Sequence, residues 1–205
     1  YLTIEVYMTT EQLLPKSTTV EAPVLELITK RKSRRAYQPR VIQPEVIQSL
    51  FEAARWAPSS NNEQPWVYIY ATKDQPELWG KLFEAINPWN QIWAKDAPLL
   101  VLCLVRKNFQ KTGKPNPSAR YDLGAANAFL SLQATELGLN VHQMGGYYPE
   151  KAIELLNISE AYEPVVMMAI GYLGAEEQLT PELQARENAP RERNTREAFV
   201  MNKGF

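Results

Sequence analysis

The chain has 205 residues, a length that fits one domain with a substantial hydrophobic core. Hydrophobic residues make up 45% and charged residues 22%, which excludes a chain that is disordered throughout. The 22 Lys and Arg residues nearly balance the 23 Asp and Glu residues, so the overall charge attracts neither nucleic acid nor an anionic membrane.

The cysteine content and the hydrophobic runs limit the class further. The one cysteine, Cys103, excludes an internal disulfide and a cysteine-based zinc site, and the lone His142 lacks metal-ligand spacing. The longest apolar run, residues 97–105, is too short to span a bilayer, and no signal-peptide pattern opens the chain. We therefore expect a cytoplasmic protein with no bound metal and no nucleic-acid or membrane partner.

The N-terminal part divides into an arm and the start of a domain. Residues 1–23 show no hydrophobic period and are expected to form an N-terminal arm, while residues 24–205 are expected to form a single domain. A short helix begins at Val24 and runs into the basic residues 30–35. A second helix begins at Pro44 and ends before Pro58, because the residue before a proline avoids the helical region.

The middle of the chain alternates strands and helices. Residues 59–65 form a polar loop, residues 67–70 have the composition of a strand, and residues 76–87 indicate a helix. The strand at residues 99–105 is apolar on both faces, which places it in the middle of a sheet covered on both sides.

The longest helix is predicted at residues 121–137, and it is apolar or small nearly all round. It is therefore expected to be buried centrally or at a subunit interface. Strands at 141–144 and 165–171 follow, with a short helix from Pro149 between them. After Gly174 the chain is charged and is expected to be loop-like. The alternation predicts an α+β fold, with a mixed, mainly antiparallel sheet covered by helices.

Three segments carry groups that could bind a ligand. The segment Arg31-Lys32-Ser33-Arg34-Arg35 suits a phosphate, because one guanidinium group can donate two parallel hydrogen bonds to phosphate oxygens. The alternative is a solvated basic helix end. The polar segment 57–66 suits a polyol chain or the edge of a heterocycle, or is simply a turn. The tail Arg191-Glu192-Arg193 is solvated, or closes around the same phosphorylated ligand.

These segments together resemble the nitroreductase family of flavin enzymes. The resemblance rests on the string Arg31-Lys32-Ser33-Arg34-Arg35-Ala36-Tyr37, followed about twenty residues later by residues 57–66, which read APSSNNEQPW. The long helix at 121–137 and the basic tail at 191–193 also agree. The family implies a nitroreductase-like fold and FMN held between the two subunits of a homodimer, with residues 175–205 as a C-terminal arm that crosses to the partner.

The resemblance also implies which residues hold FMN. Those expected to contact it are Arg31, Lys32, Ser33, Arg35, Pro58, Ser59, Ser60, Asn62, Gly145, Gly146, Arg191 and Arg193. The cluster 31–33 and the tail arginines are expected near the phosphate and ribityl chain, and Arg35 near the pyrimidine edge. The loop residues 58–62 are expected to come from the partner subunit, and Gly145 and Gly146 to present backbone to the flavin ring.

The implied activity is hydride transfer from NADH or NADPH through flavin N5 to nitroaromatics, quinones or similar small acceptors, with no catalytic side chain required. The alternatives are a flavin-destroying or reductive-dehalogenating enzyme of the same fold, or a flavin- or nucleotide-binding module without turnover. Cys103 is interpreted as a buried, unreactive thiol, and His142 as a core or near-core residue, with a catalytic role near Gly145 as the alternative for His142. Trp79, Trp89 and Trp93 are interpreted as packing, with stacking on a planar acceptor as the alternative.

Overall fold

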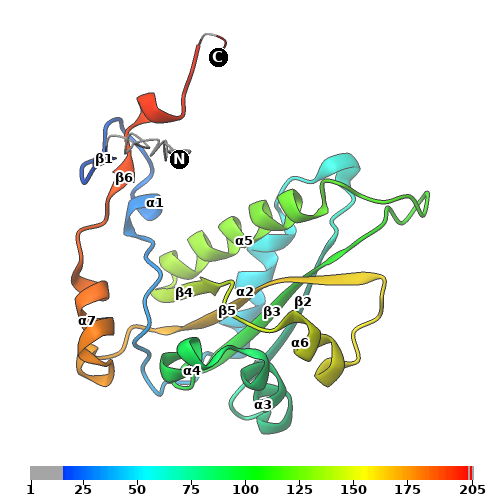
Figure 1. Cartoon of the computed structure of the whole chain (residues 1–205), viewed down its shortest axis with the longest axis horizontal. Helices are drawn as coiled ribbons and strands as arrows, with labels where there is room; N and C mark the ends of the chain where they lie inside the picture. The colour runs from blue at the N-terminus through cyan, green and yellow to red at the C-terminus, as the bar shows by residue number, and fades with distance from the viewer. Residues whose placement is uncertain (1–15, 203, 205) are drawn as a thin grey trace, which may run out of the picture.

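The computed structural model describes residues 16–202 and 204 of the chain. A four-stranded sheet lies at its centre with helices on both faces, and a small two-stranded sheet joins segments near the two ends of the described chain (Figure 1). The helices are α1 (Glu26–Lys30), α2 (Pro44–Arg55), α3 (Pro76–Ala85), α4 (Pro88–Ala94), α5 (Ala119–Glu136), α6 (Pro149–Leu156) and α7 (Pro181–Asn188). The strands are β1 (Lys16–Ser17), β2 (Trp66–Thr72), β3 (Leu99–Arg106), β4 (Leu139–Met144), β5 (Tyr162–Tyr172) and β6 (Arg193–Asn194).

The central sheet has the strand order β2-β3-β5-β4, and each neighbouring pair is antiparallel. β3 lies in the middle and is buried at every residue but its last, as its doubly apolar sequence predicts. Cys103 on this strand is fully buried, and burial raises the pKa of its thiol, so the thiol stays protonated. The expected α+β fold with a mainly antiparallel sheet is confirmed.

Helices pack on both faces of the sheet in two layers (Figure 1). Val101 and Cys103 of β3 point to the face covered by α2 and α5, while Leu100 and Leu102 point to the face covered by α3, α4 and α6. This alternation follows from the two-residue period of a strand. Each such fully buried leucine contributes about 1.5–3 kcal/mol to the stability of the fold.

The long helix α5 is present within two residues of its predicted bounds. It ends shortly before Gly138, which has a φ of 73°, a backbone conformation that glycine adopts without the steric penalty of a side chain. One face is buried through Leu123, Leu130 and other apolar side chains. The opposite face leaves Tyr121 83% and Phe129 42% exposed, so the helix carries an apolar surface that its own chain does not cover.

The structure contains two helices that were not predicted, α4 and α7, and the expectation of a loop-like segment after Gly174 was wrong. The helix expected at 76–87 ends at Ala85, and a further helix, α4, begins after Asn87, whose side chain accepts a hydrogen bond from the backbone N–H of Asn90. The segment expected to be loop-like contains α7. The Thr180 hydroxyl accepts a hydrogen bond from the backbone N–H of Leu183, Pro181 takes the first helical position, and the buried Leu183 packs against the core. Both helices begin at a proline that follows a capping side chain, and both are held by buried apolar residues, Trp93 in α4 and Leu183 in α7.

Two short segments near the ends of the described chain lie side by side. β1 pairs with β6, so Lys16 and Ser17 lie opposite Asn194 and Arg193 (Figure 1). Most of the expected N-terminal arm, residues 1–15, lies outside the described residues. Among the residues that the structure describes, no helix is both long and apolar enough to cross a membrane.

Candidate functional site

A basic cavity of about 240 Å³ lies where three separate segments meet: the chain after α1, the C-terminal turn of α7, and the segment before β6. These segments run next to one another at one side of the molecule (Figure 1). The lining residues are Arg31, Lys32, Ser33, Arg34, Arg35, Arg186, Glu187, Ala189, Arg191 and Arg193. The structure therefore brings both basic clusters singled out in the sequence into one site.

Arg191 ties the C-terminal segment to the end of α1. Its guanidinium donates to the carbonyl oxygens of Thr29 and Arg31, which are among the last carbonyls of that helix. Cations are favoured at this end of a helix because the carbonyl groups carry the negative pole of the helix dipole. Arg191 thus fixes the geometry of the cavity and has its Nη1 and Nη2 engaged with backbone.

Arg31 is held among other cations. Its Nη1 lies 3.3 Å from the Ser33 hydroxyl oxygen and donates to it. Burial lowers the pKa of the Arg31 guanidinium, and the positive charges of Arg191 and Arg193 lower it further. The arrangement concentrates positive charge at Arg31, and an anion bound there would offset the repulsion.

The other end of the cavity contains a carboxylate. Arg35 Nη1 donates to Glu187 Oε1 at 2.9 Å, and Arg34 Nη1 donates to Glu187 Oε2 at 3.3 Å. Neither Arg34 nor Glu187 was assigned a role from the sequence. Arg34 lay within the recognised cluster, whereas Glu187 gave no local signal because α7 itself was not predicted.

His142 and Trp93 lie behind these arginines. The ring centroids of Trp93 and His142 are 4.5 Å apart, and the guanidinium of Arg35 lies 6.0 Å from the centroid of Trp93. His142 Nδ1 lies 3.2 Å from the carbonyl oxygen of Arg34, so this nitrogen carries the proton and donates. Burial, and then the charge of Arg35, lower the pKa of His142 to about 4, so the imidazole is neutral near pH 7.

The two glycines after β4 differ from each other. The carbonyl oxygen of Gly146 accepts from Asn87 N and from Asn90 Nδ2, both at 3.1 Å. A Cβ at Gly146 would lie 2.5 Å from side-chain atoms of both asparagines, so this position requires glycine. Gly145 is exposed with open space around it, and it follows His142 by three residues at the end of the same strand.

The polar loop after α2 lies elsewhere. Ser60 N donates to the buried Asp122 at the N-terminal end of α5, and Ser59 Oγ accepts from Gln64 N. Asn61 and Asn62 both have a φ of 54°, a conformation that asparagine tolerates better than most residues. Pro58 and Asn62 are exposed, and Ser59 and Ser60 are partly exposed.

The loop and the basic cavity lie at opposite ends of α5 (Figure 1). The pKa of Lys30, at the end of α1, is raised by its hydrogen bond to Glu26 and more weakly by Glu136 at the C-terminal end of α5. An 18-residue helix is about 27 Å long. One chain therefore brings together the residues expected around the phosphate, and it does not bring the loop residues 58–62 to them.

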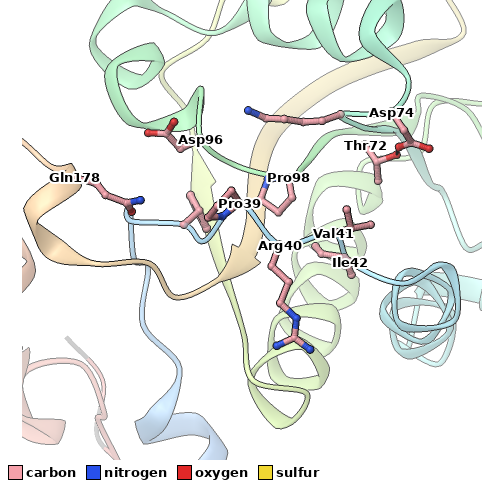
Figure 2. A pocket seen from close by; sticks show the side chains of 11 residues that line it. Pro39, Arg40, Val41, Ile42, Thr72, Asp74, Asp96, Pro98 and Gln178 are labelled. Carbon is pink, nitrogen blue, oxygen red and sulfur yellow. Dashed lines mark hydrogen bonds between the residues drawn. The ribbon is translucent and has the colours of Figure 1, made fainter.

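A second cavity, of about 350 Å³, lies where β2 and β5 end and β3 begins. Figure 2 shows Arg40 extending away from Asp74 and Asp96. The Arg40 guanidinium lies 3.9 Å from the ring centroid of Tyr172, and the Thr72 hydroxyl donates to Asp74. The charged groups of this cavity therefore do not converge on one point, unlike those of the basic cavity.

The chain is similar to proteins whose names describe reductases. The sequence profile of the nitroreductase family matches residues 28–88 and 73–172. A protein of Methanothermobacter thermautotrophicus named "Putative NADH dehydrogenase/NAD(P)H nitroreductase" is 31% identical over 153 residues, which cover 73% of this chain and 76% of that protein. A protein of the same name from Archaeoglobus fulgidus is 32% identical over 152 residues, which cover 72% of this chain and 84% of that protein.

A solved structure described as an oxidoreductase containing FMN superimposes with a TM-score of 0.86 at 33% sequence identity. The match covers 91% of this chain and 95% of that chain. The similarity therefore extends over most of both chains.

Proposed function

Because this chain belongs to the nitroreductase family, we propose that it is an FMN-dependent oxidoreductase that moves a hydride from NADH or NADPH to a small acceptor. Nitroaromatics, quinones or similar planar molecules are the proposed acceptors. The observation that carries the proposal is the basic cavity, which gathers Arg31, Ser33 and Arg193 from distant parts of the chain.

The donor set of this cavity suits the phosphate of FMN. Among the lining residues that the structure describes, seven are cationic and Glu187 is the one carboxylate. Glu187 is engaged by Arg34 and Arg35, which leaves the charge around Arg31 and Arg193 uncompensated. A phosphate dianion at Arg31, Ser33 and Arg193 would receive charge-assisted hydrogen bonds and relieve the repulsion between the cations.

Arg35 in the cavity, and Gly145, which is not among the residues that line it, would orient the flavin. Arg35 would face the pyrimidine edge, where its positive charge stabilises the negative charge that reduction adds. The exposed backbone of Gly145 would approach the ring, because no side chain blocks it. Bound here, FMN would supply the hydride chemistry of its N5 atom, and the proposed role of this chain's residues is to bind and orient it, with no catalytic role assigned to His142.

The proposed functional unit is a homodimer. The loop residues Pro58, Ser59, Ser60 and Asn62 lie at the far end of α5 from the basic cavity, so a second chain would have to supply them. The exposed Tyr121 and Phe129 on α5 offer an apolar surface for that second chain. The exposed Phe199 and Val200 would lie against the partner as the end of the arm formed by residues 175–205.

The absorption spectrum of the purified protein tests the proposal. We expect a yellow protein with about one FMN per chain, whose flavin absorbance is bleached by NADH or NADPH under anaerobic conditions and restored by a quinone or nitroaromatic. A protein that stays colourless after incubation with FMN would contradict the proposal. Bound flavin that no nicotinamide reduces would favour a binding module, and aerobic loss of the flavin itself would favour a flavin-destroying enzyme.

A further inference from the structure

The carboxylate of Glu187 is almost completely buried in the wall of the basic cavity. Its side chain is 3% exposed, compared with 20% for Arg34 and 21% for Arg35. Arg34 makes a second contact, from Nη1 to the backbone carbonyl of Glu187 at 3.2 Å. One residue of α7 thus holds Arg34 and Arg35, the second of which is expected near the flavin ring.

The sequence of α7 explains how the carboxylate reaches this place. The buried Leu183 and Glu187 are four residues apart, so they lie on the same face of the helix, which is turned toward the core. On the neighbouring side, the guanidinium of Arg186 lies 5.3 Å from the ring centroid of Trp89 on α4. The helix is therefore fixed by contacts on two sides, and the position of Glu187 is determined by the fold.

Glu187 divides the cavity into two electrostatic regions. Near Arg34 and Arg35, one carboxylate offsets part of the charge of two guanidinium groups. Near Arg31, the charges of Arg191 and Arg193 add to one another and lower the Arg31 pKa, after the larger effect of burial. An anion entering the cavity is therefore drawn toward Arg31 and away from Arg35.

We infer that Glu187 is a positioning residue that fixes Arg35 beside the flavin ring, reduces its effective charge, and directs the FMN phosphate toward Arg31 and Arg193. This inference rests on the proposed function. It assigns to α7 the control of two properties: how strongly the site prefers FMN over riboflavin, and how easily the bound flavin is reduced.

The alternative is a buried ion pair that only stabilises the fold. Removing one partner of such a pair is destabilising because the other charge is left buried without compensation. Loss of stability alone therefore does not separate the two roles. The reduction potential of the bound flavin and the ratio of FMN to riboflavin affinity do, because a purely structural ion pair changes neither.

The test uses the full chain with Glu187→Gln, Glu187→Asp and, as a control, Glu177→Gln, which removes the same charge at an exposed position before α7. FMN and riboflavin affinities are measured by fluorescence titration of flavin-free protein, and the potential of the bound flavin by a reductive titration against a reference dye. Thermal unfolding is recorded for every variant.

For Glu187→Gln we expect a more positive flavin potential and FMN binding about tenfold tighter, with riboflavin binding much less affected, because one negative charge near the phosphate is lost. Glu187→Asp keeps the charge but withdraws it from Arg35 by one methylene group, so smaller shifts of the same sign are expected. Glu177→Gln should match the wild type. If Glu187→Gln does not fold, Glu187→Asp carries the test.

The outcomes separate this inference from the proposed function. If wild-type protein binds no FMN, the proposed function fails, and this inference fails with it. If wild type and all folded variants bind FMN and riboflavin with the same ratio and show the same potential, the inference alone is overturned. In that case Glu187 serves only the stability of α7.

Discussion

The basic cavity and the polar loop after α2 are the two halves of the proposed cofactor site. A single chain forms the cavity completely, whereas it leaves the loop far from that cavity. The cavity is assembled within one chain from segments more than 150 residues apart, through contacts such as that of Arg191 with Arg31 and Thr29. The loop at residues 58–62 is local and uncharged, and it is fixed by the hydrogen bond from Ser60 to Asp122.

This difference indicates how the two halves depend on assembly. Cations placed close together repel one another, so Glu187 and backbone carbonyls must hold them in place before any ligand arrives. The neutral loop can remain at the surface at little cost, because water satisfies its amides and hydroxyls. The charged half is therefore formed within each chain, and under the proposed function the neutral half would join a site only in a dimer.

Subunit complementation gives the largest expected effect. Arg31→Ala removes the centre of the basic cavity, and Asn62→Asp places a negative charge in the loop, so each homodimer is expected to lose FMN binding. When the two variants are mixed and allowed to exchange subunits, about one quarter of the sites should recover FMN, because half of the dimers are mixed and each has one intact site. The measurement is flavin absorbance of the dimer fraction after gel filtration.

No recovery in a mixture shown by mass spectrometry to contain mixed dimers would mean that both halves serve the same chain or that the loop is not part of the site. Recovery without mixing of subunits would also contradict the proposed division. Arg55→Ala, an exposed position on α2, provides a control that should bind FMN alone and in mixtures.

Phosphate recognition gives the next largest effect and concerns only the charged half. Each charge-assisted hydrogen bond contributes roughly 1.5–3 kcal/mol, so we expect FMN to bind at least about a hundredfold more tightly than riboflavin. Arg193→Ala should narrow this difference about tenfold or more, since it removes a phosphate contact and leaves the ring contacts unchanged. Titrations with both flavins measure the effect, and Lys95→Ala, an exposed lysine beyond α4, is the control. Equal affinities for both flavins in the unmodified protein would show that these arginines do not bind the phosphate.

The pH dependence of stability concerns the charged half, where His142 lies beside Arg35. The pKa of His142 is about 4 in the folded chain and 6.5 ordinarily, so between these values the unfolded chain binds the extra proton. The contribution of the neutral imidazole to the free energy of unfolding is fully present above about pH 6.5, and roughly 3 kcal/mol of it is lost as the pH drops through 4. In His142→Gln, which cannot titrate, the difference in unfolding free energy between pH 7.5 and 4 should shrink by this amount in urea titrations. An unchanged difference would mean that the imidazole is not held neutral beside Arg35.

The sequence predicted the elements that follow a simple period or a proline boundary. β3 is recognisable because all its faces are apolar, α5 because its apolar pattern is long, and α2 because it begins at Pro44. The basic cluster was recognised from Arg31 to Arg35. Its meeting with Arg191 and Arg193 was one of two alternatives that the residues left open, and the resemblance favoured it, because no local pattern encodes a contact over 150 residues.

What the sequence did not predict depends on tertiary contacts. α7 has a polar composition, and it is helical because Leu183 is buried and Thr180 caps it. Without that helix, nothing indicates that Glu187 meets Arg34 and Arg35. The neutral state of His142 depends likewise on burial and on Arg35, neither of which is visible in the residues next to it.

The smallest expected effect concerns the backbone of the neutral loop. Asn61 is exposed and has a φ of 54°, so replacing it tests the conformation of the loop without removing packing. Asn61→Gly should change the free energy of unfolding by less than about 1 kcal/mol, whereas Asn61→Val should cost about 1–2 kcal/mol because a β-branched side chain disfavours positive φ. Urea unfolding measures both. If the loop is supplied to the partner's cofactor, Asn61→Val should also weaken FMN binding, while Asn61→Gly should not. Equal stability of the two variants would show that residue 61 does not hold this conformation in solution.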